Sequence, residues 1–328
     1  MKTRRRLLFA LAASPIAWAR AQPAKPGGKP VRVGTLIFGI PSSDYSAKPF
    51  VDALRELGWT EGRNVIYDSV HAEPGRGREH ARAVAKELVA RRPDLVWVRG
   101  NAAALAVFAN TRTIPIVFAG VANPVENGLV QSLARPGGNV TGVANIGWEL
   151  GGRRMQLLKE ILPRIRRVGV LMGPDPLGGS PEELKLIEQA AGTGVNAIPA
   201  IVKGNALETA FTLLAEKRVE AVLTCHITTF LRERKRVLDW AAKEKIPVIA
   251  HRSELADDGA LISYSANLLD QFRRSAQLAD RVLKGAKPAD IPVEQPTKFE
   301  LVVNMKTARA LGITIPQSVL LQASRVIE

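Results

Sequence analysis

The sequence alternates short β-branched runs with longer segments of helical periodicity, and this alternation is the feature that most restricts the fold. Runs that are apolar throughout and separated by helices form parallel sheets with right-handed crossovers and helices on both faces. The pattern therefore predicts an α/β fold. The predicted strands are 31–37, 64–70, 95–99, 114–119, 139–144, 167–172, 196–202, 221–225, 247–250 and 260–264. The predicted helices are 49–57, 78–90, 102–110, 149–162, 182–191, 207–216, 229–243 and 269–283.

The chain has 328 residues, which is long enough for two such sheets. A Pro-Gly-Gly turn at 136–138 leads into one more strand, and a new helical run starts at Trp148. Each half also opens with a similar Val-rich strand, at Val31 and at Val168. We therefore predict two doubly wound Rossmann-like lobes with a ligand cleft between them, because such sheets bind ligands beyond the carboxyl ends of their strands. The expected lobes are 31–145 with about 256–286, and 146–255 with about 287–328.

Residues 1–21 have the three parts of a secretory signal peptide. A basic start is followed by the apolar run 7–13 and by small residues that allow cleavage after Ala19 or Ala21. The apolar run is too short to span a bilayer, and the alternative is an N-terminal anchor that is never cleaved. Arg4-Arg5-Arg6 also resembles a twin-arginine signal, so two export routes stay open. Residues 22–30 are rich in Pro and Gly and predict a flexible spacer.

The formal net charge of +15 would by itself indicate nucleic acid or an anionic membrane as a partner. Five of the positive charges belong to the predicted signal peptide, however. The others are spread along helices such as 78–92 and 232–245, and aromatic residues make up only 5% of the chain, too few for a base-stacking surface. We therefore expect no nucleic-acid partner.

The single cysteine, Cys225, lies in an apolar run and is expected to be a buried structural thiol. It has no second cysteine for a disulfide, and no cysteine near the cleavage site can carry a lipid anchor. We therefore expect a soluble periplasmic protein without a lipid anchor.

Motifs that carry catalysis are absent from the sequence. It contains no Gly-x-Gly-x-x-Gly after a strand, no Walker loop, no Gly-x-Ser-x-Gly elbow and no His-Glu-x-x-His. The four histidines do not pair at metal-ligand spacing, and no acidic pair is brought together for acid–base work. The sequence therefore predicts a binding protein rather than an enzyme, with no cofactor and no metal.

Small and polar residues follow several predicted strands, at the edge where a cleft would open. A helix that begins at Asn101-Ala102-Ala103 would present free backbone N–H groups, which suit a carboxylate or a phosphate. For each Ser, Asn and Asp, hydrogen bonding within the loop is the alternative role. The other candidates at strand ends are Ser42, Ser43, Asp44, Gly120, Val121, Asn123, Asn145, His226 and His251.

Five stretches together resemble the ABC transporter substrate-binding protein family that includes tryptophan/tyrosine-type binders: 58–65, 113–118, 123–142, 284–301 and 304–316. The resemblance covers nearly the whole chain after the predicted signal peptide. It implies the periplasmic binding protein type I fold, in which two lobes close on a small solute like a Venus flytrap. It also implies a monomer that docks on an ABC permease in the inner membrane.

The resemblance further implies a set of ligand-binding positions. At two places, however, this chain departs from the family pattern. The family usually has Asp where this chain has Asn123, and often an acid or amide where it has Cys225-His226. Loss of an anion removes a partner for an amino group, so a neutral or anionic solute rivals an α-amino acid. Phe38, Tyr45, Trp148 and Tyr264 are candidates for an apolar slot. The implied ligand contacts are Ser42, Ser43, Asp44, Asn101, Ala102, Ala103, Gly120, Val121, Asn123, Asn145, Asp175, His226, His251 and Tyr264.

Three other classes of protein are compatible with this fold. A transcription regulator's sensor domain would need an N-terminal helix-turn-helix, and residues 1–30 have the signal-peptide pattern instead. A periplasmic enzyme would need a reactive cluster of side chains, which the sequence does not show. A ligand-sensing periplasmic protein that feeds a receptor stays open as an alternative.

Overall fold

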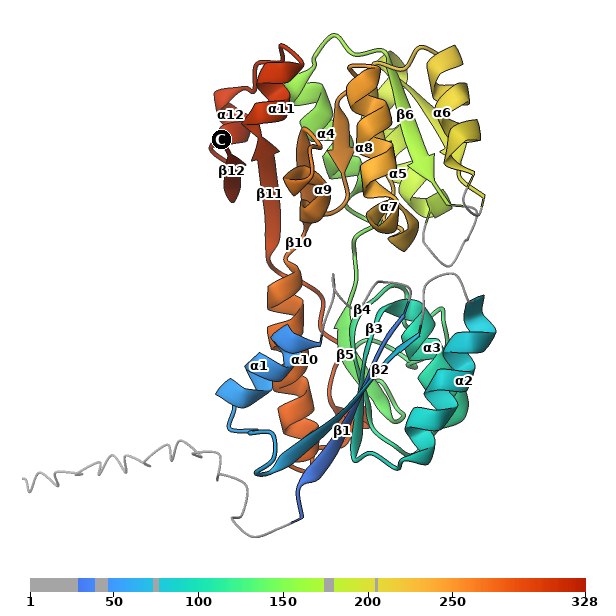
Figure 1. The fold of residues 1–328 in the computed structure, drawn as a ribbon, viewed down its shortest axis with the longest axis vertical. Coiled ribbons are helices and arrows are strands. Elements are labelled where there is room, and N and C mark those ends of the chain that lie inside the picture. Colours follow the sequence, from blue (N-terminus) through green and yellow to red (C-terminus); the bar gives the residue numbers. More distant parts are fainter. Residues whose placement is uncertain (1–28, 39–46, 73–76, 174–179, 204–205) are drawn as a thin grey trace, which may run out of the picture.

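The structure, a computed structural model, describes residues 29–38, 47–72, 77–173, 180–203 and 206–328. These residues form two lobes, each built on a sheet of its own (Figure 1). The predicted signal peptide, 1–21, lies outside the described residues. Among the helices that the structure describes, none is both long enough and apolar enough to span a bilayer.

The first lobe has a five-stranded sheet in the order β2-β1-β3-β4-β5, and its strand pairs are all parallel. Helices α2 and α3 pack on one face of this sheet, and α1 and α10 pack on the other. The strands are β1 (Val31–Phe38), β2 (Val65–Ala72), β3 (Leu95–Arg99), β4 (Ile116–Val121) and β5 (Val140–Ala144). The helices are α1 (Lys48–Glu56), α2 (Gly77–Ala90), α3 (Gly100–Asn110) and α10 (Leu268–Leu283).

The second lobe has a seven-stranded sheet in the order β12-β11-β10-β9-β8-β6-β7, in which only the β10–β11 pair is antiparallel. Its strands are β6 (Arg167–Met172), β7 (Asn196–Ile201), β8 (Ala221–Thr224), β9 (Val248–Ala250), β10 (Ile262–Ala266), β11 (Phe299–Asn304) and β12 (Arg325–Ile327). Its helices are α4 (Gly151–Ile161), α5 (Ser180–Ala191), α6 (Leu207–Glu216), α7 (Thr228–Arg232), α8 (Arg234–Lys243), α9 (Ser253–Asp257), α11 (Met305–Ala310) and α12 (Gln317–Leu320).

The predicted architecture of two doubly wound lobes is confirmed, and each predicted strand and helix has a counterpart in the structure. The predicted helix 229–243 is divided at Glu233 into α7 and α8. Strands β11 and β12 were not predicted, although the run Leu301-Val302-Val303 carries a β-branched signal. Cys225 is buried, as its apolar neighbours predict.

Within the described residues, the chain passes between the lobes three times: after β5, after β10, and between the short 3-10 helix η3 (Pro288–Asp290) and β11 (Figure 1). The predicted return to the first lobe near 256 is wrong, because β10 is an inner strand of the second sheet. The predicted switch to the second lobe at 287 is also wrong, because Val293 packs in the first lobe's core and Glu294 bridges to Val143. A strand or helix pattern does not reveal which of two similar sheets it joins, so only pairing decides these boundaries.

Helix α10 returns from the second lobe and is anchored firmly in the first. At its start, the Asn267 side chain caps the helix by accepting a hydrogen bond from the Asp270 N–H at 2.8 Å. In its middle, the buried Trp97 Nε1 donates to Ser275 Oγ at 3.0 Å, while the indole stacks on Phe50 at 4.5 Å between ring centroids. The bond from Trp97 to Ser275 fixes the position of α10 relative to the first sheet.

We expect Trp97→Ala to lower the free energy of unfolding by about 3–5 kcal/mol, because it removes a fully buried ring that packs on both α1 and α10. Urea unfolding followed by far-UV circular dichroism measures the change. Leu321→Ala is the matched control, since Leu321 is 77% exposed and its loss should change stability by less than about 0.5 kcal/mol. Equal effects of the two substitutions would contradict the role given to Trp97.

Candidate functional site

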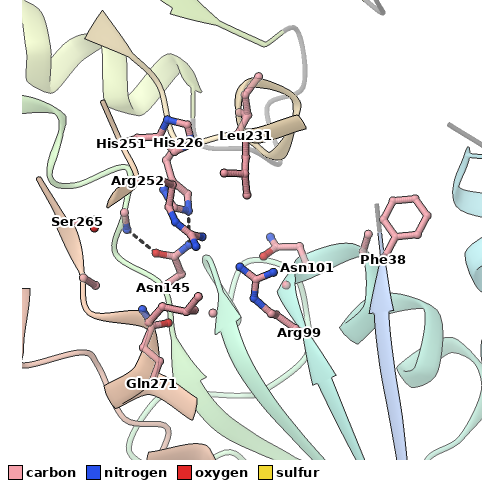
Figure 2. Close-up of a pocket in the computed structure, with 17 residues that line it drawn as sticks. Phe38, Arg99, Asn101, Asn145, His226, Leu231, His251, Arg252, Ser265 and Gln271 are labelled. Carbon is pink, nitrogen blue, oxygen red and sulfur yellow. Dashed lines mark hydrogen bonds between the residues drawn. The ribbon is translucent and has the colours of Figure 1, made fainter. Parts of the chain in front are cut away.

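A cavity of about 130 Å³ lies between the two lobes (Figure 2). Its volume is of the same order as that of cavities that hold one aromatic ring. The first lobe lines it with the ends of β1, β3 and β4 and the starts of α3 and α10, and the second lobe with the segments after β8 and β9. The lining residues are Phe38, Arg99, Gly100, Asn101, Ala102, Gly120, Asn145, Gly147, His226, Ile227, Leu231, His251, Arg252, Ser265, Ala266, Leu268 and Gln271.

Predicted site residues from both lobes meet in this lining. They share a position at or just beyond the C-terminal end of a parallel strand, which is where doubly wound sheets bind ligands. Phe38, a candidate for the apolar slot, also lines the cavity. The predicted residues found there are Asn101, Ala102, Gly120, Asn145, His226 and His251.

Four other predicted residues lie outside the lining. Ala103 and Val121 are fully buried and pack in the first lobe's core. Asn123 takes a left-handed backbone conformation, φ 48°, in the loop after β4. The Tyr264 ring stacks on Phe299 at 6.1 Å and packs against the second lobe's core. The predictions at Ser42, Ser43, Asp44 and Asp175 fall outside the described residues.

Asn101 holds the first-lobe wall of the cavity in shape. Its Nδ2 donates to the Ala122 carbonyl at 3.1 Å, and its Oδ1 accepts from the Ala122 N–H at 2.8 Å. The side chain thus pairs with the backbone as a strand would. It joins the start of α3 to the loop after β4. Asn101 therefore has a structural role in hydrogen bonding a loop, which is the alternative role that its sequence position allowed.

Asn145 and His226 form the centre of the second wall. Asn145 Oδ1 accepts from the Gly147 N–H at 2.7 Å, so its Nδ2 faces His226 Nε2, also at 2.7 Å. His226 Nε2 is therefore the acceptor and the proton of the neutral ring lies on Nδ1. A Cβ at position 147 would lie 2.5 Å from His226 Nδ1, so only glycine permits this close approach.

His251 lies beside His226, with the two rings edge to face at 5.3 Å. Its Nδ1 is 2.8 Å from Thr224 Oγ1. Burial, together with the positive charges of Arg252, Arg154 and Arg99, lowers the pKa of His226 well below its ordinary value. Burial likewise lowers the pKa of His251 well below its ordinary value, and His226, Arg154 and Arg252 add to this effect. Both imidazoles are therefore neutral at physiological pH.

A buried ion pair between Arg154 and Glu183 holds this wall in place. Arg154 also donates to the Gly147 carbonyl at 2.9 Å, in the crossing after β5, and to the Tyr264 carbonyl at 3.1 Å, in strand β10. The second carboxylate oxygen of Glu183 accepts from the His226 N–H at 2.8 Å. One pair therefore joins the crossing after β5, strand β10 and the backbone of His226.

Sequence reasoning missed the two arginines of the lining. Arg99 is the last residue of β3, and Arg252 directly follows His251 after β9. Burial and the charge of Arg252 lower the pKa of Arg99 well below its ordinary value, and burial lowers the pKa of Arg252 to about 10. The sequence did contain a sign of their role: an arginine at or just after the C-terminal end of a buried parallel strand lies at the edge of the sheet that faces the cleft.

The described part of the lining contains no Asp or Glu. The family usually has Asp at the position of Asn123, but Asn123 lies outside the lining, so this difference does not alter the charge of the described lining. Amide groups, a hydroxyl, two neutral imidazoles and two guanidinium groups face the cavity alongside Phe38 and Leu231. This set can hydrogen-bond a polar solute and enclose an apolar part, but it offers no group arranged as a nucleophile with its base.

A protein-family model described as ABC transporter substrate binding protein matches residues 32–327. A tyrosine-binding protein from Clostridioides difficile (strain R20291) is 27% identical over 276 residues, which cover 83% of this chain and 78% of that protein. These matches extend over both lobes.

Two solved structures are also similar over both lobes. The ABC domain in complex with L-Trp from Streptococcus pneumonia is 29% identical, with a TM-score of 0.82, over 91% of this chain and 100% of that one. A conserved domain protein from Vibrio cholerae is 27% identical, with a TM-score of 0.81, over 91% of this chain and 100% of that one.

We expect Arg154→Met to lower the free energy of unfolding by about 3–5 kcal/mol, because it leaves the Glu183 carboxylate buried without its partner. The surface pair Arg167–Glu220, whose side chains are 42% and 38% exposed, provides the control. Arg167→Met should cost less than about 1 kcal/mol. Urea unfolding of both variants tests this, and a small loss for Arg154→Met would show that the pair does not hold the wall.

The histidine pair predicts a loss of stability on mild acidification. The unfolded chain binds protons at His226 and His251 below about pH 6.5, whereas the folded chain, with both pKa values lowered, does not. The free energy of unfolding should therefore be unaffected by these histidines above pH 6.5, and it should fall as the pH drops toward 5. The melting temperature between pH 7.5 and 5 measures this. The double variant His226→Gln/His251→Gln should show a shallower slope, and an unchanged slope would refute the assignment.

Proposed function

The chain belongs to the ABC transporter substrate-binding protein family, and we propose that it captures a small solute in the cleft and delivers it to a membrane permease. The two lobes have the periplasmic binding protein type I arrangement that the sequence predicted. A solute in the cavity would contact Arg99 and Gln271 on one side and His226 and Arg252 on the other. It would therefore stabilise the closed arrangement of the lobes, which a permease can distinguish from the open one.

The observation that carries this proposal is that both lobes and their crossing segments supply the cavity walls (Figure 2). A ligand that touches both lobes shifts the open–closed equilibrium by its difference in affinity for the two states. A ligand held by one lobe alone would not report its presence through closure. The shared lining thus favours a carrier protein in which solute binding changes the arrangement of the two lobes.

The proposed ligand is a small solute that is either amino acid-like or a small organic anion. Relatives named for tyrosine and for L-Trp support the first class. Phe38, Leu231 and Leu268 offer apolar contacts for such a solute, and Gln271 and Ser265 offer hydrogen bonds. We propose that binding occurs without turnover, in a monomer exported to the periplasm by the signal-peptide pattern of residues 1–21.

The purified protein should gain several degrees of melting temperature with one class of small solute, because a ligand at 100 times its Kd adds about 2.7 kcal/mol of stability. A thermal-shift screen of amino acids, carboxylates and nucleosides tests this. Chromatography of the stabilising compound after overnight incubation should return it unchanged. Formation of a product would overturn the proposal of binding without turnover.

Gln271→Ala should weaken solute binding about threefold to tenfold, since it removes one hydrogen-bonding group from the lining. Gln277→Ala is a matched control on the same helix, because Gln277 lies on the exposed face of α10 and bonds Arg274 there. Isothermal titration with the solute found in the screen measures both affinities. Equal affinities for the two variants would place the solute elsewhere.

A further inference from the structure

The end of the first lobe that lies farthest from the second lobe is built from the connections that lead into its parallel strands. All the strands of this sheet begin at that end, which is the lower end of the body in Figure 1. The connection into the short helix η3 ends there too. We call this surface the basic pole, and it comprises residues 29–30, 57–64, 91–94, 111–115, 131–139 and 284–290.

These connections lie side by side across the end of the sheet. The strand order places 57–64 next to 29–30, followed by 91–94, 111–115 and 131–139. The remaining connection, 284–290, is joined to 131–139, because the Gly137 N–H donates to the Ala289 carbonyl at 3.4 Å. The basic pole is therefore one continuous surface.

Positive charge is concentrated at the basic pole. It contains eight basic and three acidic residues, a net charge of +5. This is half of the +10 that remains when the five positive charges of the predicted signal peptide are subtracted from +15. The last turns of the adjoining helices lower the net charge of this end only to +4. The connections into β6 to β10 of the second lobe, counted in the same way, have +2, and −1 with the adjoining turns.

The basic side chains of the pole are available to a partner. All eight are exposed, and two of them form ion pairs, Arg91 with Asp68 and Lys284 with Asp280. Leu57, which is 36% exposed, adds an apolar side chain to the same surface. The six basic residues that form no ion pair with any other described residue are Lys29, Arg63, Arg92, Arg112, Arg135 and Lys287.

We propose that the basic pole binds the surface of an anionic phospholipid bilayer. Each exposed Lys or Arg close to such a surface raises the partition coefficient about fivefold. Leu57 would enter the headgroup region, but one apolar side chain and no covalent lipid give reversible contact rather than stable anchoring. Nucleic acid is the other polyanion that high net charge suggests. It fits less well, because the only aromatic residue of the pole, Trp59, is buried and offers no face for base stacking.

The course of the chain agrees with this orientation. Lys29 and Pro30 lead directly into β1 at the basic pole, so the segment with the predicted signal peptide joins the first lobe at the surface proposed to face the bilayer. No residue of the pole lines the cavity between the lobes. A bilayer and a solute can therefore be bound together, and this inference goes beyond the proposed function without depending on the identity of the solute.

Vesicles of defined composition test the proposal. The mature chain from residue 22 is mixed with vesicles of phosphatidylcholine, to which phosphatidylglycerol is added in increasing proportion, and flotation measures the bound fraction. We expect binding that rises with the phosphatidylglycerol content and none to phosphatidylcholine alone. We also expect partition to weaken about tenfold between low and physiological ionic strength, because salt screens the exposed charges.

Two variants of equal net charge locate the surface. The pole variant should lower partition into phosphatidylglycerol vesicles about a hundredfold, because it removes four charges that contact lipid. It combines Arg63→Gln, Arg92→Gln, Arg135→Gln and Lys287→Gln. The control variant should lower partition less than about threefold, because its four exposed charges lie at the far end of the second lobe. It combines Arg164→Gln, Lys217→Gln, Arg218→Gln and Lys245→Gln. Circular dichroism checks that both variants are folded.

The outcomes separate this inference from the proposed function. Equal losses in the two variants, equal binding to both kinds of vesicle, or tighter binding to a single-stranded oligonucleotide than to phosphatidylglycerol would overturn the inference. None of these results bears on solute binding, because neither variant changes a residue of the cavity lining. Both variants should keep the solute-dependent rise in melting temperature, and failure of the solute screen alone would overturn only the proposed function.

Discussion

The buried ion pair of Arg154 and Glu183 is the contact on which the geometry of the cleft depends. Both side chains are fully buried, so the cost of removing their charges from water is large and is offset only while each has its partners. Those partners are the carbonyls of Gly147 and Tyr264 and the N–H of His226. One inter-lobe crossing, strand β10 and the backbone of His226 are therefore held together by a single interaction inside the second lobe.

The first lobe fixes its own wall by different means. Trp97 anchors α10 through Ser275, and Asn101 bonds Ala122 through both ends of its amide. Rigid walls on both sides matter for function, because a site that is already formed in each lobe needs only the motion of the lobes to be completed. Each of the three crossings lies between elements that belong to different lobes, so the proposed closure would bend the crossings and leave both sheets intact.

The electrostatics of the cleft follow from burial rather than from the high net charge of the chain. Burial, with the neighbouring arginines, lowers the pKa of His226 well below its ordinary value, so this ring is neutral beside Arg252. Among the described lining residues, the charged side chains are therefore those of Arg99 and Arg252, and the start of α3 lies beside them. The many surface arginines and lysines lie farther away and are screened by salt.

The sequence by itself determined the α/β class, the two doubly wound lobes and the strand ends where His226, Asn145 and Asn101 would lie. It did so because apolar periodicity and strand-end position are local properties of the chain. Only the tertiary structure decided that β10 belongs to the second sheet, that Tyr264 turns toward Phe299, and that Arg99 and Arg252 meet across the cleft. These features depend on contacts between segments that are distant in the sequence. Neither arginine can be distinguished from the other lysines and arginines, 46 in all, until both lobes are placed together.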